Sequence, residues 1–372
     1  MTVDRPATDF GSDNMAGISP AILKAIAEAS DGLAPSYGRD AITARVEARF
    51  RDLFETDLTV FLVSTGTAAN ALSLSAVAPP YGAIFCHANA HVAQDECNAP
   101  EFFTGGAKLV PLAGAHGKVH AAALDAALRE RVAGHRPPHF PPAAALSLTQ
   151  STESGTVYGV HEVGEIAAVA KAHGLALHMD GARFANAIAA LGCSPAAITW
   201  RSGVDVLSFG ATKNGALAAE AVVAFDPALA QSLAYRRKRG GHLFSKMRFL
   251  AAQFEAYLAD DLWLRNAGHA NAMAQRVAAG LAGIDGVRIA FPVEANAVFA
   301  ELPEALATRL AAQGFGFYRW GAEGRLARFV TSFATRPGDV DALIAAAKAA
   351  SGLTAPRSAT QAGRRDPEPR SS

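Results

Sequence analysis

The sequence predicts an α/β protein, with a large domain built on a mostly parallel sheet covered by helices and a smaller α+β domain after it. Two observations indicate this fold class. From Leu58 onward, short apolar runs alternate with longer segments of helical periodicity, which is the pattern of repeated βαβ units. From about Leu243, long alanine-rich helical runs replace this alternation, and only scattered strand candidates interrupt them.

Two helices are expected before the first strand of the large domain. Ser19 followed by Pro20 is a helix-start signal, and a second amphipathic helix places Val46 and Phe50 on one face. Beyond these helices, compact apolar runs bounded by turn residues indicate buried strands, and the periodic segments between them indicate helices. We expect strands at residues 60–63, 83–86, 108–110, 143–148, 175–179 and 204–209, and helices at residues 66–78, 120–132 and 162–173.

The chain is predicted to divide into three parts. Residues 1–255 would form an N-terminal segment and the large domain, and residues 256–350 the small C-terminal domain. Strand candidates in the small domain lie near residues 287–289, 298–300 and 328–330. Residues 351–372 are rich in Pro, Ser and Arg without periodicity, which predicts a disordered tail.

Composition excludes several classes of function. The 372-residue chain is half hydrophobic, so it can bury a large core, and its formal net charge is zero, so no overall field attracts nucleic acid or a charged membrane. Three cysteines without paired spacing argue against a disulfide framework and a zinc cluster. The start of the chain has no apolar signal core, and no window is long enough to span a bilayer. We therefore expect a soluble, cytoplasmic protein without a metal site.

Lys213 is the first candidate for chemistry. It follows the buried strand at residues 204–209 and is flanked by small polar residues before Asn214 and Gly215 break the chain. An amine that is partly removed from water at such a position is a usable nucleophile for a carbonyl group. A lysine in a solvated surface turn would give the same local pattern, so the remaining strand ends have to decide between the two interpretations.

Two other strand ends carry residues that complement Lys213. Gly66 and Thr67 begin a helix directly after a strand, where free N–H groups and the helix dipole favour an anion such as phosphate, although a plain helix cap would look the same. Asp180 ends another strand and suits either a core ion pair or the ring nitrogen of a pyridine, and Arg183 suits a carboxylate or phenolate oxygen. Because parallel strands end at one edge, the set predicts a site for pyridoxal 5′-phosphate, with Lys213 forming the Schiff base.

These residues belong to motifs that resemble the low-specificity L-threonine aldolases, which are fold-type-I pyridoxal-phosphate enzymes of the β-eliminating lyase family. The stretch from His91 to Phe103 is similar to the bacterial branch, and the resemblance covers roughly residues 8–348. The motifs are Ser12-Asp13-Asn14, Tyr37-Gly38-x-Asp40, Gly66-Thr67-x-Ala69-Asn70, the run from His178 to Arg183, and Thr212-Lys213-Asn214-Gly215.

The resemblance implies roles for individual residues. Thr212 would join Gly66 and Thr67 on the phosphate, and His91 would stack on the cofactor ring. The substrate carboxylate would be bound by Ser12, Arg183 and Arg328. Tyr37 and Lys238 would reach an active site shared across a dimer interface, in an assembly that is usually a homotetramer.

One departure from the family concerns the base that takes the proton of the β-hydroxyl group. Thr152 and Glu153 stand where many members carry a histidine, so attention shifts to His91 and Asp95. Asp95 would contact the substrate hydroxyl or orient His91, unless the acidic pair that it forms with Glu96 is merely solvated.

The implied reaction is retro-aldol cleavage of L-threonine, L-allo-threonine and related L-β-hydroxy-α-amino acids to glycine and an aldehyde. Three alternatives stay open: a phenylserine aldolase with an aromatic aldehyde product, another reaction of the same cofactor such as β-elimination or transamination, and a non-catalytic protein that senses the cofactor. Metal binding by His87 and His91 and nucleic-acid binding by the basic run at residues 236–239 are disfavoured, since His87 follows a strand and the run is short and lacks neighbouring aromatics.

Overall fold

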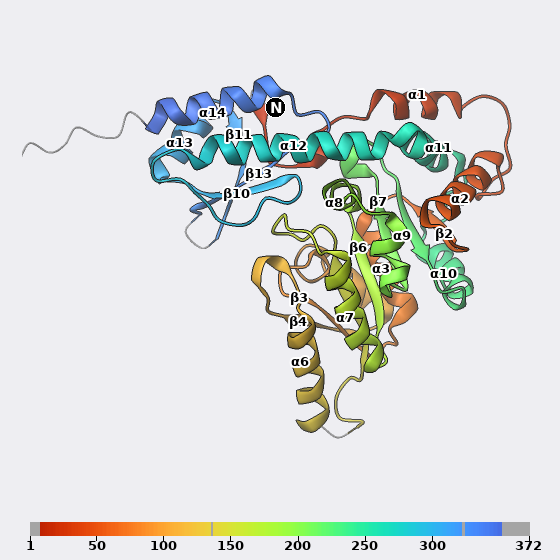
Figure 1. Cartoon of the computed structure of the whole chain (residues 1–372). Coiled ribbons are helices and arrows are strands. Elements are labelled where there is room, and N and C mark those ends of the chain that lie inside the picture. Colours follow the sequence, from red (N-terminus) through yellow and green to blue (C-terminus); the bar gives the residue numbers. More distant parts are fainter. Residues whose placement is uncertain (1–7, 135–136, 322–323, 352–372) are drawn as a thin grey trace, which may run out of the picture.

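The fold is built around two sheets, one in each domain. A computed structural model describes residues 8–134, 137–321 and 324–351 of the chain, so the predicted disordered tail lies outside the described residues except for Ser351. A seven-stranded sheet forms the centre of the large domain, and a four-stranded antiparallel sheet belongs to the small domain (Figure 1). The predicted α/β class with a smaller α+β domain is confirmed.

The large sheet is parallel over most of its width. Pairing is parallel from β4 through β3, β5 and β6 to β7, and β8 pairs antiparallel with both of its neighbours, β7 and β2. In spatial order the strands are β2 (Thr59–Val63), β8 (Glu220–Ala224), β7 (Val206–Gly210), β6 (Ala176–Gly181), β5 (Ala143–Thr149), β3 (Ala83–His87) and β4 (Lys108–Leu112).

Both faces of this sheet are buried, which explains why its strands are continuous apolar runs. In β2, Val60 and Leu62 point into the larger core cluster, whereas Phe61 and Val63 point into a separate cluster on the opposite face. Strand β8 was not predicted from the sequence, although Asp226-Pro227 marks a turn after it, because its short run starts with the charged Glu220 and follows a loop of small residues.

Helices cover the two faces of the large sheet. Helix α3 lies across β5 to β8 on one face and contacts α5 and α10, while α7 and α8 contact β6 on the other face, where α6 packs against α7. The helices of the large domain are α1 (Pro20–Glu28), α2 (Ala41–Phe54), α3 (Gly66–Val77), α4 (His91–Gln94), α5 (Ala99–Thr104), α6 (Ala121–Gly134), α7 (Val160–Ala172), α8 (Phe184–Leu191), α9 (Pro195–Ile198), α10 (Ala228–Arg239) and α11 (Arg248–Leu258).

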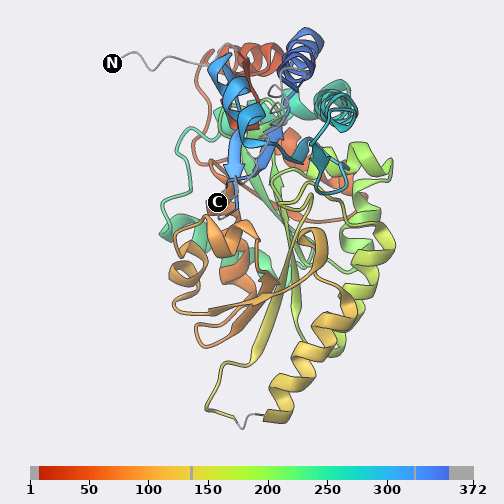
Figure 2. The same cartoon turned by 90° about the vertical axis from the view of Figure 1, so that its left-hand side faces the viewer.

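Helix α12 (Leu262–Ala282) connects the two domains. It runs across the top of the molecule in Figure 1, and it contacts α8 and α11 of the large domain as well as α14 and β10 of the small domain. Figure 2 shows the small domain at the end of the molecule opposite to α6. The small domain comprises β9 (Arg288–Ile289), β10 (Ala297–Glu301), α13 (Glu304–Ala312), β11 (Phe315–Gly316), β12 (Tyr318–Trp320), β13 (Leu326–Val330) and α14 (Pro337–Ser351).

The first described residues of the chain join the small domain. Strand β1 (Thr8–Asp9) pairs in parallel with β11, and Phe10 is fully buried in the core of the small domain beside Phe329. The sequence prediction grouped this segment with the large domain, and the structure attaches its beginning to the other one. Among the described residues, no helix combines the length and apolarity needed to cross a bilayer.

Phe209 is the centre of the aromatic core beneath the sheet, and its replacement should destabilise the large domain. Its ring is fully buried and lies 5.2 Å from Phe50, 5.7 Å from Phe184 and 6.0 Å from Trp263, centroid to centroid. We expect Phe209→Ala to lower the free energy of unfolding by about 3–5 kcal/mol, measured by urea denaturation. Tyr235→Ala, at a 73% exposed aromatic residue, is the control and should change it by less than about 0.5 kcal/mol.

Candidate active site

A cavity of about 270 Å³ lies where β2, β6 and β7 reach their carboxyl ends. This is the edge at which a mostly parallel sheet binds ligands, because the loops that follow neighbouring strands meet there. Six residues predicted from the sequence share this cavity: Gly66, Thr67, His91, Asp180, Thr212 and Lys213. The remaining residues that line it are Asn14, Ser64, Thr65, Asn70, Glu153, Ala182 and Glu220.

Lys213 projects from a single helical turn, Thr212–Asn214, that follows β7. The neighbouring Asn214 anchors this turn, since its amide donates hydrogen bonds to the Tyr257 hydroxyl at 2.7 Å and to the Trp263 carbonyl at 2.8 Å. Within the described part of the chain, the Lys213 amine itself has neither a hydrogen bond nor an ion pair. A fixed backbone therefore presents an unpaired, half-buried amine to the cavity.

Asp180 forms the acidic wall of the cavity at the end of β6. Its side chain accepts hydrogen bonds from the Ala182 backbone N–H at 3.0 Å and from the Asn70 amide at 2.9 Å. Asp180 is almost fully buried, so its charge requires compensation from the protein or from a ligand. The sequence quoted Asn70 as part of a motif but gave it no role, and the structure makes it the residue that holds Asp180.

His91 is oriented by Glu96, and not by Asp95. The His91 Nδ1 atom lies 2.8 Å from Glu96 Oε1, and the same oxygen accepts a hydrogen bond from Asn70 at 2.7 Å. The hydrogen bond to Glu96 raises the pKa of His91, with smaller contributions from Asp180 and Glu153, while burial raises the pKa of Glu96. Asp95 is exposed, does not line the cavity and makes no side-chain hydrogen bond to His91.

The start of α3 supplies the anion-binding end of the cavity. Thr65 caps the helix, with its hydroxyl accepting a hydrogen bond from the Ala68 N–H at 3.1 Å. A Cβ atom built on Gly66 would meet nothing within 4 Å, so the space above the helix start is open to a ligand. An anion at this position would be stabilised by the unpaired N–H groups and the helix dipole.

The residues present fit pyridoxal 5′-phosphate. The open helix start suits a phosphate group, the buried carboxylate of Asp180 suits a protonated ring nitrogen, and the Lys213 amine suits the aldehyde. His87, the alternative metal ligand, contacts main-chain groups with both ring nitrogens: Nε2 lies 3.0 Å from the Gly114 carbonyl oxygen, and Nδ1 accepts a hydrogen bond from the Asn89 N–H.

Two arginines lie beside the site, and they differ in how their guanidinium groups are paired. The Arg183 guanidinium donates two hydrogen bonds to Asp13, at 2.7 Å and 3.0 Å, and although burial opposes its charge, Asp13 raises its pKa. The Arg328 guanidinium packs against the rings of Tyr318 and Trp320 and donates one long hydrogen bond to the Gly11 carbonyl. Burial, followed by repulsion from Arg183, lowers the pKa of Arg328.

Comparison with known proteins identifies the family. The model of the beta-eliminating lyase family matches residues 9–305. A low specificity L-threonine aldolase from Pseudomonas aeruginosa is 48% identical over 326 residues, which are 88% of this chain and 93% of the relative. The chain belongs to the beta-eliminating lyase family, among the low specificity L-threonine aldolases. The family resemblance predicted from the sequence motifs is thereby confirmed.

Solved structures agree with this family and fold. A threonine aldolase from Leishmania major has a TM-score of 0.86 at 29% identity, covering 92% of this chain and 99% of its own. A structure described as SPT with PLP has a TM-score of 0.64 at 16% identity, covering 92% of this chain and 86% of its own, and it shows the shared fold. The predicted fold-type-I architecture is confirmed.

The other predicted site residues of this aldolase-family chain lie outside the cavity lining. Ser12 uses its hydroxyl to accept a hydrogen bond from the Asn14 N–H, and Asn14 rather than Ser12 reaches the cavity. Tyr37 and Lys238 lie together on the surface, with the Lys238 amine 5.3 Å from the centre of the Tyr37 ring. Neither of them lines the cavity of its own chain.

Two acidic residues of the cavity were not given a role from the sequence. Glu153 was noted there only as a departure from the family, and Glu220 was not noted at all, because the strand that carries it was not predicted. The signal that was present for Glu220 is a charged residue at the start of an otherwise apolar run, which is rare in a buried strand unless the charge has a partner.

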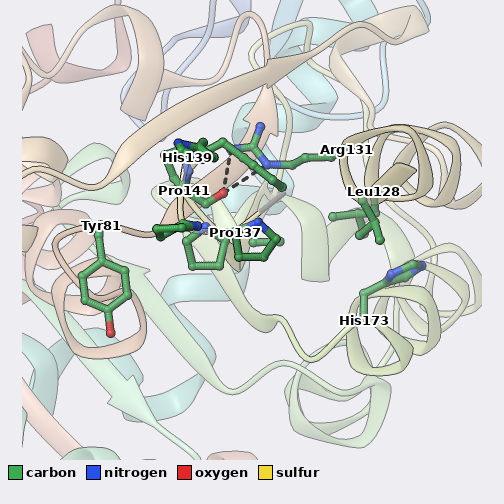
Figure 3. Close-up of a pocket in the computed structure, with 12 residues that line it drawn as sticks. Tyr81, Leu128, Arg131, Pro137, His139, Pro141 and His173 are labelled. Atoms are coloured by element: carbon green, nitrogen blue, oxygen red, sulfur yellow. Dashed lines mark hydrogen bonds between the residues drawn. The ribbon is translucent and has the colours of Figure 1, made fainter. Parts of the chain in front are cut away.

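A larger cavity, of about 760 Å³, lies away from the aldolase site at the amino end of β5 (Figure 3). Prolines such as Pro137 and Pro141 line it, and Arg131 donates hydrogen bonds to the Pro141 carbonyl. His173 is hydrogen-bonded to Asp125 instead of facing another reactive group. This apolar cavity does not gather a nucleophile, a base and an anion site, so the chemistry belongs to the smaller one.

The pKa of His91 should depend on Glu96 and not on Asp95. Replacing Glu96 with Gln keeps the shape of the side chain but removes the negative charge that stabilises the imidazolium, so the His91 pKa should fall. The measurement is an NMR titration of the His91 ring nitrogens. Asp95→Asn is the matched control one residue away, and its His91 titration should coincide with that of the wild type. The opposite ranking of the two variants would contradict the assignment.

Proposed function

We propose that the chain cleaves L-threonine, L-allo-threonine and related L-β-hydroxy-α-amino acids to glycine and an aldehyde, using pyridoxal 5′-phosphate bound in the smaller cavity. The observation that carries the proposal is the convergence of an unpaired amine, a buried carboxylate and an open helix start on one cavity. Family membership supports the same reaction, since the Pseudomonas aeruginosa relative is named a low specificity L-threonine aldolase.

The cofactor, when bound, supplies an electron sink for the electrons of the bond that breaks between Cα and Cβ. Gly66, Thr67 and Thr212 would hold its phosphate, and the Lys213 amine would hold its aldehyde end. Asp180 keeps the proton on the ring nitrogen, which requires that the carboxylate stay fixed. The hydrogen bonds from Asn70 and Ala182 provide this.

His91 acts as the base for the β-hydroxyl group. Because Nδ1 is directed at Glu96, the neutral ring carries its proton on Nδ1 and leaves the lone pair of Nε2 free to accept a proton. A positioned base of this kind contributes about 10²–10⁴-fold to a rate. The exposed position of Asp95 favours His91 over a water shared between the two residues.

Arg328 binds the substrate carboxylate. Arg183 already donates a bidentate pair of hydrogen bonds to Asp13, so one full edge of its guanidinium is used within the protein. Arg328 has a single long hydrogen bond, and its buried Nε has no partner among the described residues. A buried donor without a partner is unfavourable, and a carboxylate would satisfy it.

A second copy of the chain completes the site. Tyr37 is tied to the segment before α11 by its N–H, which donates to the Ser245 carbonyl at 2.9 Å. Leu33, in the same loop, is fully exposed, and Phe244 is 39% exposed. Exposed apolar side chains in the two segments joined at Tyr37 support a dimer in which Tyr37 and Lys238 reach the partner's cavity, and a tetramer as a dimer of dimers.

The Lys213→Ala variant tests the proposed reaction. The wild type should show the visible absorbance band of the bound cofactor and convert L-threonine to glycine and acetaldehyde in equal amounts, and the variant should lose both the band and nearly all turnover. Lys24→Ala, at an exposed lysine of α1, is the control and should keep both. Turnover by Lys213→Ala without the band, or ammonia and a keto acid as the wild-type products, would refute the proposal.

The Arg328→Gln variant tests the binding of the substrate carboxylate. Loss of a charged hydrogen-bonded contact costs about 1.5–3 kcal/mol, so KM for L-threonine should rise by about 10- to 100-fold with little change in cofactor affinity. Arg319→Gln, in the neighbouring strand β12, removes an arginine that pairs with Glu304 at the surface and should leave KM unchanged. An equal effect of the two substitutions would exclude Arg328 from the substrate site.

A further inference from the structure

Glu220 is a buried carboxyl group that lies between the strand leading to the start of α3 and the strand leading to Lys213. It is the first residue of β8, and the sheet register places it opposite Val63 of β2 and opposite Gly210 of β7. Those two residues directly precede the anion-binding loop and the turn of Lys213. Glu220 is only 6% exposed and lines the cavity, so its side chain is directed toward the ligand and not toward water.

Few hydrogen bonds or positive charges of the protein stabilise the ionised form of this carboxyl group. The described structure gives it one long backbone hydrogen bond, from the Thr212 N–H at 3.4 Å, the Thr212 side chain also favours its ionised form, and Lys213 makes no ion pair with it. The charged groups that act on it are Lys213, which favours the carboxylate, and Asp180, which opposes it.

Tyr257 of α11 is a further titratable group that faces Glu220: burial and then the charge of Glu220 raise the pKa of Tyr257, so the phenol is neutral over the pH range of interest. Helix α3, which packs against β8, has no titratable side chain, and the neighbouring residues Val63 and Gly210 are apolar.

A phosphate group and an ionised Glu220 would repel each other strongly in this position. The repulsion between like charges is weakly screened in a buried site, and both groups would compete for the N–H of Thr212. A protonated carboxyl group, by contrast, donates a hydrogen bond to a phosphate oxygen. Burial, only partly offset by Thr212 and Lys213, raises the pKa of Glu220 to about 7, so the proton is available near neutral pH.

We propose that Glu220 binds the cofactor phosphate as a carboxylic acid, so that cofactor binding takes up one proton and weakens as the pH rises. The inference rests on the proposed function, because it requires that a phosphate bind at this end of the cavity. It adds a cofactor-binding residue that also makes retention of the cofactor sensitive to pH.

The sign of the effect follows from linkage. The free protein carries a Glu220 pKa of about 7, and a phosphate beside the carboxyl group raises that pKa further. Below the lower of these two pKa values, Glu220 is protonated in both states and adds no pH dependence. Above it, binding consumes a proton, and the dissociation constant rises by up to about tenfold per pH unit until the higher pKa is reached.

The test uses pyridoxine 5′-phosphate, an alcohol that cannot react with Lys213 and so isolates binding from Schiff-base chemistry. Its dissociation constant is measured calorimetrically at a series of pH values for the wild type, Glu220→Gln and Asp205→Asn. Asp205 is the matched control, a partly buried carboxyl group before β7 that accepts a hydrogen bond from the Leu177 N–H away from the cavity. Titration of the phosphate itself is common to all three proteins.

The wild type and Asp205→Asn should lose affinity with rising pH more steeply than Glu220→Gln, by about one factor of ten per pH unit above neutrality. Pyridoxine without the phosphate should bind all three proteins with the same pH profile. Parallel profiles of the wild type and Glu220→Gln with pyridoxine 5′-phosphate would overturn the proposal, while the visible band of bound pyridoxal 5′-phosphate would leave the proposed function intact. Absence of binding by both phosphate esters in the wild type would overturn both.

A second measurement covers the case in which Glu220→Gln does not fold. Calorimetry of the wild type in buffers of different ionisation enthalpy reports the protons taken up on binding. We expect uptake of about one proton more with pyridoxine 5′-phosphate than with pyridoxine above the Glu220 pKa, since protonation of the ring nitrogen is common to both ligands. Equal proton uptake with the two ligands would contradict a carboxylic acid on the phosphate.

Discussion

The burial of Asp180 in the middle of a rigid sheet is the constraint on which the rest of the site depends. Strand β6 is paired on both sides, by β5 and by β7, so the carboxylate cannot move toward water without breaking the sheet. Asn70 reaches it from α3 and also binds Glu96, which in turn orients His91. One amide group therefore couples Asp180 to the pair of Glu96 and His91, the residue proposed as the base.

The small domain reaches the same site through a second buried charge. Asp13, near the N-terminus, accepts hydrogen bonds from Arg183 of the large domain and, at 3.1 Å, from Asn296 just before β10 of the small domain. The Arg328 side chain, from β13 of the small domain, packs against Tyr318 and Trp320 and donates a hydrogen bond to the Gly11 carbonyl, next to the segment that carries Asp13. In the proposed function the cofactor residues come from one domain and Arg328 from the other, so the position of the substrate would depend on how the two domains pack.

The sequence was sufficient to predict the site residues that lie at the ends of strands. It was not sufficient to predict which of two neighbouring side chains points into the site. Apolar runs locate the ends of β6 and β7, and parallel pairing then brings Asp180 and Lys213 together. Nothing in the pattern shows which of two adjacent acids after the four-residue helix α4 turns inward. The inward residue is Glu96, because Asp95 ends the helix and the chain then turns through left-handed backbone at Cys97. Such a choice depends on tertiary packing.

The acidic residues around the cavity are compensated only in part by basic side chains. Bound protons have to be counted as well before the charges of the site balance. A cavity for an anionic cofactor has four acidic residues on or beside its walls, which by themselves would repel the phosphate. Glu96 is paired with His91 and Asp13 with Arg183, so that Glu153 remains to oppose the charge of Arg328. In the proposed complex, Asp180 would face the ring nitrogen and Glu220 would carry a proton of its own. With each acid compensated, the remaining site is close to neutral. A near-neutral buried site favours a zwitterionic amino acid over a ligand with net charge, because only the zwitterion enters without leaving a buried charge unpaired.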